Sequence, residues 1–284
     1  MFLSCILFVT TIRAQQKQSS DFPIHIIKLG GSVITQKGAA TPQANNAVIE
    51  SIAQQIATFL HNNPNHRIII VHGGGSFAHP PAKKHKLHLG IDKTNKHAVM
   101  LVHDAMKQIN KILVDALNNA GVMALPVHPM SCVVCKNGKI EHIHKQVLLQ
   151  LLQQNFVPVL HGDLVVDTEK GICILSGDQI TPYLAKQFSI SCAGLASCQD
   201  GVYDNAGNVV PEITDDNFEQ IRHFLGSSEH VDVTGGMMGK ILELLSEQAP
   251  PSSCIFNGQT EKNVLRFLKG ETIGTIIVKR QCFF

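Results

Sequence analysis

Hydrophobic positions follow two alternating patterns along this chain from Asp21 onward. Short apolar runs that end in turn-forming residues are typical of buried strands, and longer stretches with apolar residues at helical spacing are typical of helices. The apolar runs predict strands over 24–31, 67–76, 122–127, 157–163, 189–197, 253–258 and 274–279. The helical spacing predicts helices over 45–60, 93–119, 145–154, 177–187, 216–225, 236–248 and 261–268.

Two further segments are predicted to form β-hairpins. In 132–143 an Asn-Gly pair stands between apolar flanks, which is a strong hairpin signal, and 164–175 is interpreted as a second hairpin. Because the other strands alternate with helices, we predict an α/β protein with a mostly parallel sheet covered by helices on both faces. Ligands bind beyond the carboxyl ends of such strands, and the glycine-rich segments of this chain fall at those ends.

The composition narrows the class of protein. With 284 residues, 44% of them hydrophobic, the chain can bury a core as one large unit or as two fused lobes. A formal net charge of +2 excludes a nucleic-acid-binding protein that relies on a broad basic face, so no nucleic acid partner is expected. The high apolar content excludes intrinsic disorder, and the lack of a repeat period excludes collagen-like and solenoid architectures.

The cysteines and the N-terminal residues indicate in which cellular compartment the protein is expected. Eight cysteines in a chain this long are not the dense framework of a small secreted protein. We interpret Cys132 and Cys135 as structural thiols rather than a metal or redox site, because no second close pair supplies further zinc ligands. The apolar run over 1–12 is too short to span a bilayer, so we expect no stable membrane insertion. Residues 1–20 are predicted to be a disordered or targeting extension of a cytoplasmic protein.

A pair of glycines follows the first predicted strand in Lys28-Leu-Gly-Gly-Ser32. Adjacent glycines let backbone N–H groups approach phosphate oxygens closely, and Lys28 and Lys37 on either side can neutralise a polyphosphate. The alternative is an ordinary turn with solvated lysines, and this segment alone does not decide between the two. The Walker A pattern GxxxxGK[ST] does not occur in the chain.

Three consecutive glycines follow the second predicted strand, and His79 comes four residues after the last of them. Their cost in backbone entropy favours close approach to a ligand over a simple turn. His79 is predicted at or just inside the start of the next helix, where backbone N–H groups favour an anion. A lone histidine is more often solvated or a helix cap, but the neighbouring glycines favour a hydrogen bond to phosphate. His72 is interpreted as structural.

Two segments in the second half carry similar chemistry. Thr234-Gly-Gly-Met-Met-Gly-Lys240 opens a predicted helix and again combines glycines with a lysine. Ser176-Gly-Asp178 offers a carboxylate that can orient lysines or hold the metal that accompanies a nucleotide. Asp178 can also act as the N-cap of the helix that follows, and the two interpretations are compatible.

Taken together, these segments resemble the amino-acid kinase superfamily and, within it, the isopentenyl phosphate kinase branch. KLGGSVITQK, VHGGGSFAHPPAKK, LHGD, LSGDQ, DGVYD and DVTGGMMGK occur in the family's order and spacing over residues 24–279. KLGGS and SGD are shared widely in the superfamily, whereas HGGGSF-x-H combined with DVTGGM is much more specific. The resemblance implies a three-layer αβα sandwich with a mostly parallel open sheet, usually as a homodimer. It also implies an acceptor-binding lobe over 21–175 and a nucleotide-binding lobe over 176–284.

The resemblance further implies an activity and its site residues. The activity is phosphorylation of isopentenyl phosphate, a small prenyl phosphate, to isopentenyl diphosphate, with ATP and Mg²⁺ and by direct in-line transfer. Catalytic roles are implied for Lys28, Lys37, His79 and Asp178. ATP-binding roles are implied for Lys28, Gly30, Gly31, Ser32, Gly75, Asp178, Asp200, Gly236 and Lys240. Acceptor-binding roles are implied for Gly74, Ala78, His79 and Gly162, and no protein ligand set for a metal is implied.

An acceptor that is itself a phosphate sets the demands on such a site. It is largely ionised near neutral pH, since the second phosphate pKa is about 6, and so it needs no strong general base. The site must instead align two anions and cancel their repulsion. Lys28, Lys37 and Lys240 suit the polyphosphate, together with Mg²⁺ and the glycine amides, while His79 suits the acceptor phosphate.

Two departures from the family pattern leave alternatives open. Ala78 stands where the family usually has glycine, and Cys198 replaces a carboxylate in the segment leading to Asp200. The alternatives are another phosphate or phosphonate kinase of this fold, such as a fosfomycin-kinase-like enzyme, a carboxylate kinase, and a catalytically weak nucleotide-binding regulator. An apolar slot for the prenyl tail could be lined by residues such as Val99, Met100 and Met106, although ordinary helix–sheet packing explains them as well.

Overall fold

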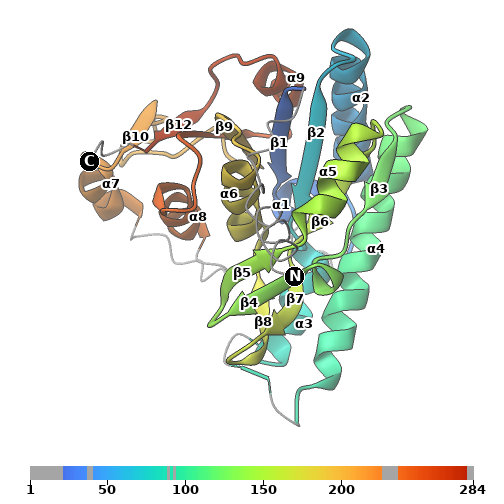
Figure 1. Ribbon diagram of the computed structural model, residues 1–284. Helices are drawn as coiled ribbons and strands as arrows, with labels where there is room; N and C mark the ends of the chain where they lie inside the picture. Colours follow the sequence, from blue (N-terminus) through green and yellow to red (C-terminus); the bar gives the residue numbers. More distant parts are fainter. Residues whose placement is uncertain (1–21, 37–40, 88–89, 92–93, 226–235, 280–284) are drawn as a thin grey trace, which may run out of the picture.

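The computed structural model describes residues 22–36, 41–87, 90–91, 94–225 and 236–279, and an eight-stranded sheet forms its centre (Figure 1). The strands are β1 (Ile24–Leu29), β2 (Arg67–His72), β3 (Ala124–Pro126), β6 (Val157–His161), β9 (Cys192–Ser197), β10 (Glu212–Thr214), β11 (Ser252–Asn257) and β12 (Thr275–Val278). Their order is β10-β12-β11-β9-β1-β2-β6-β3, and every neighbouring pair is parallel except β11 and β12. The predicted mostly parallel sheet is confirmed.

A second sheet of four strands lies below the first in Figure 1. Its strands are β4 (Val133–Lys136), β5 (Lys139–Ile143), β7 (Asp163–Asp167) and β8 (Gly171–Leu175), in the order β5-β4-β7-β8. Both predicted hairpins are confirmed, and parallel pairing of β4 with β7 joins them. Asn137 and Gly138 between β4 and β5 have φ values of 50° and 80°, as the tight hairpin turn requires.

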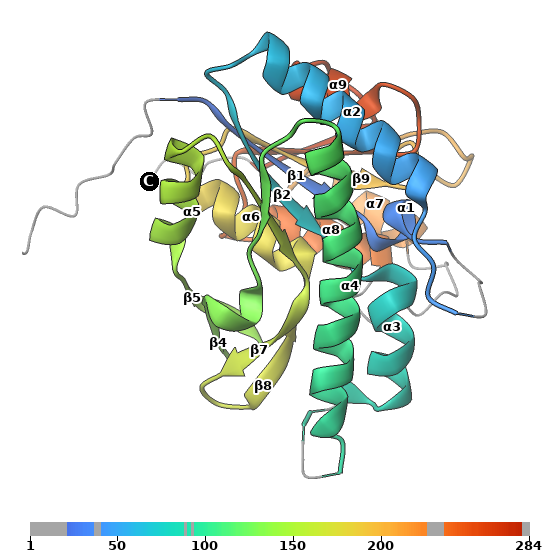
Figure 2. The same cartoon turned by 90° about the vertical axis from the view of Figure 1, so that its right-hand side faces the viewer.

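Helices cover both faces of the large sheet, which confirms the αβα sandwich (Figure 2). One face packs against α2 (Asn46–Asn62), α4 (His97–Asn119) and α9 (Asn263–Leu268), and α3 (Gly75–Lys84) lies beside α4. The other face packs against α5 (Lys145–Gln153), α6 (Gly177–Gln187), α7 (Phe218–Leu225) and α8 (Gly236–Leu245). A single helical turn, α1 (Gly31–Ile34), follows β1. Among the described residues, no helix has both the length and the apolar character needed to cross a bilayer.

Side chains alternate along β1 between the two faces of the large sheet. Ile27 and Leu29 pack into the core shared with α2 and α4, while Ile26 packs into the core on the α6 side. Since successive side chains of a strand point to opposite faces, Lys28 lies on the same face as Ile26. The sequence of β1 therefore directs the Lys28 side chain toward α6.

Some elements and element boundaries differ from the sequence prediction. The short strand β10 was not predicted, and the long helix expected from residue 93 begins at His97. Helix α3 begins directly at Gly75, so His79 is its fifth residue and not at its start. The two prolines that follow His79 also lie within this helix, although each lacks the N–H that an interior helical position uses.

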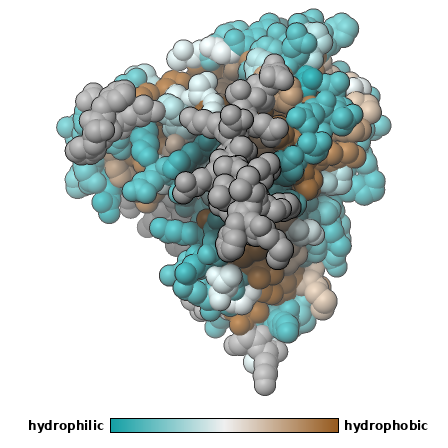
Figure 3. Space-filling model, viewed as in Figure 1, coloured by the Kyte–Doolittle hydropathy of each residue, from teal (hydrophilic) through white to brown (hydrophobic). Residues whose placement is uncertain are grey.

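The parallel strands β1, β2, β6 and β9 all end at the same edge of the sheet. Gly30, Gly73 and Gly162 directly follow the first three of these strands. The face in Figure 3 is mostly hydrophilic, with hydrophobic side chains gathered toward its lower centre. The glycine turns and the four-stranded sheet thus lie at one end of the molecule, where a ligand site is expected.

Candidate active site

A cleft of about 560 Å³ lies at the carboxyl ends of the central strands. It is bounded by the turns after β1, β2 and β6 and by the first turns of α1, α3 and α6. Its lining includes Lys28, Gly30, Gly31, Ser32, Thr35, Gly73, Gly74, Gly75, Ser76, Ala78, His79, Ala82, Val102, Met106, Gly162, Asp163, Leu164, Ile174, Ser176, Gly177, Asp178, Ser197 and Lys240. Most of the residues that the family resemblance singled out therefore line one cavity.

The turns after β1 and β2 touch each other through glycine. A Cβ on Gly31 would collide with the backbone nitrogen of Gly75. Gly75 has a φ of 49°, and a Cβ there would collide with the carbonyl oxygen of Gly31. Glycine is therefore required at both positions because the two backbone segments approach each other closely, and not only because the chain turns there.

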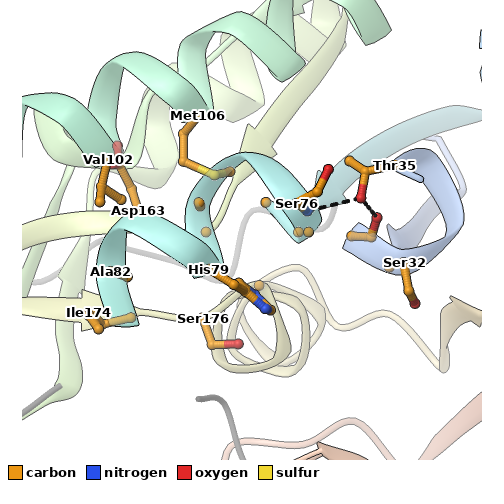
Figure 4. A pocket seen from close by; sticks show the side chains of 18 of the residues that line it. Ser32, Thr35, Ser76, His79, Ala82, Val102, Met106, Asp163, Ile174 and Ser176 are labelled. Atoms are coloured by element: carbon orange, nitrogen blue, oxygen red, sulfur yellow. Dashed lines mark hydrogen bonds between the residues drawn. The ribbon is translucent and has the colours of Figure 1, made fainter. Parts of the chain in front are cut away.

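Thr35 joins the two turns and was missed by the sequence prediction. Its hydroxyl donates to the carbonyl of Gly31 at 2.7 Å and accepts from the backbone N–H of Ser76 at 3.1 Å (Figure 4). Thr35 is 2% exposed, so both bonds are shielded from water. No spacing rule singles out this threonine, because its role depends on a contact with a residue 41 positions away.

A buried ion pair stands on the α6 side of the cleft. The Lys28 ammonium donates to the Asp178 carboxylate at 2.6 Å, with both side chains 6% exposed, and the Lys240 ammonium lies 3.9 Å from the other carboxylate oxygen. Burial disfavours the charged carboxylate, but the two ammonium groups outweigh it and hold the pKa of Asp178 below its ordinary value. Asp178 therefore stays ionised and fixes two cations at the cleft.

The alternative role of Asp178 as a helix cap is wrong. Ser176 is the N-cap of α6, and its hydroxyl accepts from the Asp178 backbone N–H at 3.1 Å. The Gln179 side chain bonds back to the Ser176 backbone, which completes a capping box. Because Ser176 satisfies the start of the helix, the Asp178 carboxylate is left to bind lysine.

His79 and Ala78 lie on the α3 wall. In Figure 4 the imidazole of His79 lies between the hydroxyl side chains of Ser32 and Ser76 and the apolar side chains farther along the cleft. Ala78 is 8% exposed and sits inside the helix with a negative φ, so its methyl group causes no backbone strain. The departure from glycine at this position is therefore compatible with the local backbone.

The far end of the cleft is apolar. Its lining there is contributed by α3, α4, β7 and β8, through Ala82, Val102, Met106, Leu164 and Ile174. Of the three α4 residues considered for such a slot, only Met106 lines it. Val99 is buried in the core, and Met100 is 64% exposed to solvent, which overturns its suggested role.

Several expected site residues lie elsewhere. Asp200 and Gly236 do not line the cleft, and the exposed Asp200 carboxylate accepts hydrogen bonds from the Asn257 amide at 2.9 Å and the Tyr203 hydroxyl at 3.2 Å. Lys37 and Thr234 lie outside the described residues. The half-buried Cys198 follows β9 and is a free thiol.

His72 has the structural role predicted for it. Its buried ring bonds to the Gly73 carbonyl at 3.0 Å through Nδ1 and accepts from the Asn110 amide at 3.0 Å through Nε2. Burial, with smaller electrostatic effects, lowers its pKa to about 4. The ring is therefore neutral near pH 7 and supports the turn after β2 from behind.

Comparison with known sequences places this chain among kinases. The model of the amino acid kinase family matches residues 23–247. The isopentenyl phosphate kinase of Methanocaldococcus jannaschii is 34% identical over 264 residues, covering 89% of this chain and 97% of that protein. The isopentenyl phosphate kinase of Haloferax volcanii is 36% identical over 252 residues, with the same coverage of 89% and 97%.

Comparison with solved structures gives the same result. An isopentenyl phosphate kinase structure matches with a TM-score of 0.76 and 28% identity, over 90% of this chain and 100% of that one. A substrate complex of an isopentenyl phosphate kinase matches with a TM-score of 0.69 and 23% identity, over 90% and 100% of the two chains, and this similarity concerns the fold alone.

Proposed function

The chain belongs to the amino acid kinase family and, within it, to the isopentenyl phosphate kinases, and from this we propose that it transfers the γ-phosphoryl group of ATP to isopentenyl phosphate. The products are ADP and isopentenyl diphosphate. One observation carries the proposal: a single cleft has a cationic end, a middle walled by His79 and two touching glycine turns, and an apolar end. That sequence of surfaces matches a polyphosphate facing a phosphate on a short hydrocarbon tail.

On the nucleotide side, we assign the ATP phosphates to the turns after β1 and β9 and to the start of α8. Lys28 and Lys240 supply positive charge, and Asp178 holds their ammonium groups in place between catalytic cycles. The cap and first turn of α1 consist of Gly30, Gly31 and Ser32, and their backbone lies close to the proposed phosphate position. Asp200, Gly236 and Lys37 remain proposed nucleotide contacts.

Mg²⁺ belongs to this proposal as the ion that accompanies ATP. The cleft carboxylate on the nucleotide side, Asp178, is already bonded to Lys28, and the described residues contain no group of three or more His, Cys, Asp or Glu side chains placed to hold a metal ion. This donor set fits Mg²⁺ bound chiefly by phosphate oxygens and water, with Asp178 as the nearby carboxylate. When bound, the ion neutralises charge that develops on the transferring group.

On the acceptor side, His79 donates a hydrogen bond to the phosphate of the acceptor and aligns it for in-line attack. Gly74 and Ala78 belong to the same wall. Gly162 contributes space and not a donor, because its N–H already bonds the His72 carbonyl at 2.9 Å. The apolar end of the cleft receives the prenyl tail, and since the acceptor is already ionised, no side chain has to remove a proton from it.

The sheet order supports the proposed lobes. Strands from residues before 176 form one half of the large sheet, strands from later residues form the other, and β1 and β9 meet between them. Exposed Met123 and Leu125, beside and on the edge strand β3, support a homodimer, which light scattering coupled to gel filtration tests. The free thiols of all six described cysteines support a reducing, cytoplasmic compartment.

A panel of acceptors tests the function. The protein is incubated with ATP, Mg²⁺ and one acceptor at a time: isopentenyl phosphate, dimethylallyl phosphate, fosfomycin or N-acetylglutamate. Mass spectrometry identifies the product, and ADP release gives the rate. We expect the highest kcat/KM with isopentenyl phosphate. Faster turnover of fosfomycin or N-acetylglutamate would replace the proposed acceptor, and nucleotide binding without turnover of any acceptor would favour a regulatory protein.

A further inference from the structure

A buried carboxylate stands directly beside the acceptor end of the cleft. Asp163 follows Gly162 at the start of β7, and its side chain is 0% exposed. Its carboxylate accepts from the Leu164 backbone N–H at 2.8 Å and from the His103 ring at 2.9 and 3.1 Å. A negative charge is thus held one residue away from the turn that we assign to a doubly charged phosphate.

His103 comes from the opposite wall of the same cleft. It lies on α4 directly after Val102, which lines the apolar end, and three residues before Met106. Figure 4 labels Asp163 and Val102 among the residues that line the cleft. The His103 side chain is 23% exposed, and its Nδ1 bonds the buried carboxylate of Asp163.

Without a counter-charge, this arrangement opposes acceptor binding. Like charges that share a poorly solvated site repel each other, and burial weakens the screening by water. Burial raises the pKa of Asp163, but hydrogen bonds from His103 and from backbone N–H groups oppose that rise. The ring N–H of His103 donates to this carboxylate and thereby offsets part of its charge.

We propose that His103 is a positioning residue for the acceptor: its hydrogen bonds hold the Asp163 carboxylate in place and offset part of its charge beside the phosphate of isopentenyl phosphate. This inference rests on the proposed function, because it takes the acceptor phosphate to lie at Gly162. It gives the His103–Asp163 pair a role in the affinity for the acceptor, with no role in binding ATP.

Other titratable groups surround His103. His128 lies with its ring centre 6.0 Å away, and His161 bonds His128 at 2.9 Å and lies 3.9 Å from Asp163. Burial lowers the pKa of both of these histidines, so they are neutral neighbours near pH 7. On α4 itself, Asp104 and Lys107 pair with each other at 2.7 Å and leave no net charge there. Asp163 is therefore the charged group to which His103 is hydrogen-bonded.

The test compares His103→Gln with the wild type and with His61→Gln, an exposed histidine change on α2 at a distance from the cleft. Steady-state kinetics at one pH give KM for isopentenyl phosphate, KM for ATP and kcat. Calorimetry without ATP gives the affinity for isopentenyl phosphate independently of turnover. The double variant His103→Gln/Asp163→Asn removes the imidazole and the carboxylate charge together.

We expect His103→Gln to raise KM for isopentenyl phosphate at least about tenfold, the size expected for a lost hydrogen bond to a charged group, because the glutamine amide does not reach the position of Nδ1. KM for ATP and kcat should change less than about twofold. The same loss should appear in the calorimetric affinity for isopentenyl phosphate, because the hydrogen bond to Asp163 acts before turnover.

The double variant should recover most of the lost affinity, which loss of packing alone does not explain. An unchanged acceptor KM in His103→Gln, or an equal change in KM for ATP, overturns the inference, and this comparison decides even where the double variant is unfolded. An active wild type with either result refutes the role of His103 alone. A wild type that binds isopentenyl phosphate without phosphorylating it refutes the proposed function and leaves the affinity test valid. A wild type that does not bind it refutes both.

Discussion

Replacing Lys28 by methionine should destabilise the protein strongly. Methionine keeps most of the side-chain volume but removes the ammonium that bonds Asp178 at 2.6 Å. The carboxylate, 6% exposed, would keep the Ser176 hydroxyl at 3.4 Å and the more distant Lys240 ammonium at 3.9 Å. Breaking one partner out of a buried pair costs about 3–5 kcal/mol, and each kcal/mol lowers the melting temperature by roughly 2–4 °C in a chain approaching this size.

The pH dependence of this loss has a defined sign. In the wild type the folded-state pKa of Asp178 lies below its ordinary value of 3.8, so the pair contributes stability above pH 4 and loses it as the pH falls below that value. In Lys28→Met, burial acts on the carboxylate with less compensation and shifts its pKa upward. The difference in unfolding free energy between the two proteins should therefore be largest near pH 7 and shrink toward pH 4.

Urea unfolding followed by far-UV circular dichroism measures this difference, since the chain has no tryptophan. Lys111→Met is the matched control, because Lys111 forms an exposed pair with Asp115, and it should cost no more than about 0.5 kcal/mol. The double variant Lys28→Met/Asp178→Asn should recover part of the stability. A loss below about 1 kcal/mol in Lys28→Met, or a loss that grows toward pH 4, would refute the reasoning.

Three further predictions follow from the site. His79→Ala should lower kcat about 100-fold or more while KM for ATP stays within about threefold; an equal loss of ATP affinity would place His79 on the nucleotide side. Gly31→Ala should cost about 1–3 kcal/mol of stability and most of the activity, since its methyl group would collide with the backbone of Gly75. A melting temperature and a turnover rate equal to those of the wild type would contradict that contact. His72 has a pKa lowered to about 4, so it reduces stability as the pH falls from 6.5 toward 4; His72→Asn should make this part of the urea stability curve shallower, and an unchanged slope would show that the ring is already charged.

Local sequence patterns were sufficient to predict most of the fold. Continuous apolar runs predicted β1 and β2, and the Asn137-Gly138 pair predicted the β4–β5 hairpin. The strand β10 was missed because its three residues are held by pairing with β12 and not by a pattern of their own. The parallel pairing of β4 with β7 was also beyond reach, since it depends on how two distant hairpins meet.

The candidate site was predictable where backbone chemistry decides it. Glycines that permit close approach are visible in the sequence, and so were the segments containing Gly31 and Gly75. The segment around Asp178 suggested that this carboxylate orients lysines, but its bond to Lys28, 150 positions away, was not predicted, because strand parity and helix placement create it. Thr35 and Asp163 were missed because their hydrogen-bond partners come from distant elements.

The most direct test of the central claim, that the cleft brings two phosphate groups together for transfer, follows the γ-phosphoryl group itself. The wild-type protein is incubated with γ-¹⁸O-labelled ATP, Mg²⁺ and isopentenyl phosphate, and the products are resolved by ³¹P NMR and mass spectrometry. We predict that the label appears in the β-phosphate of isopentenyl diphosphate, in equal amount to the ADP formed. Label recovered only as inorganic phosphate, or no prenyl diphosphate at all, would contradict the claim.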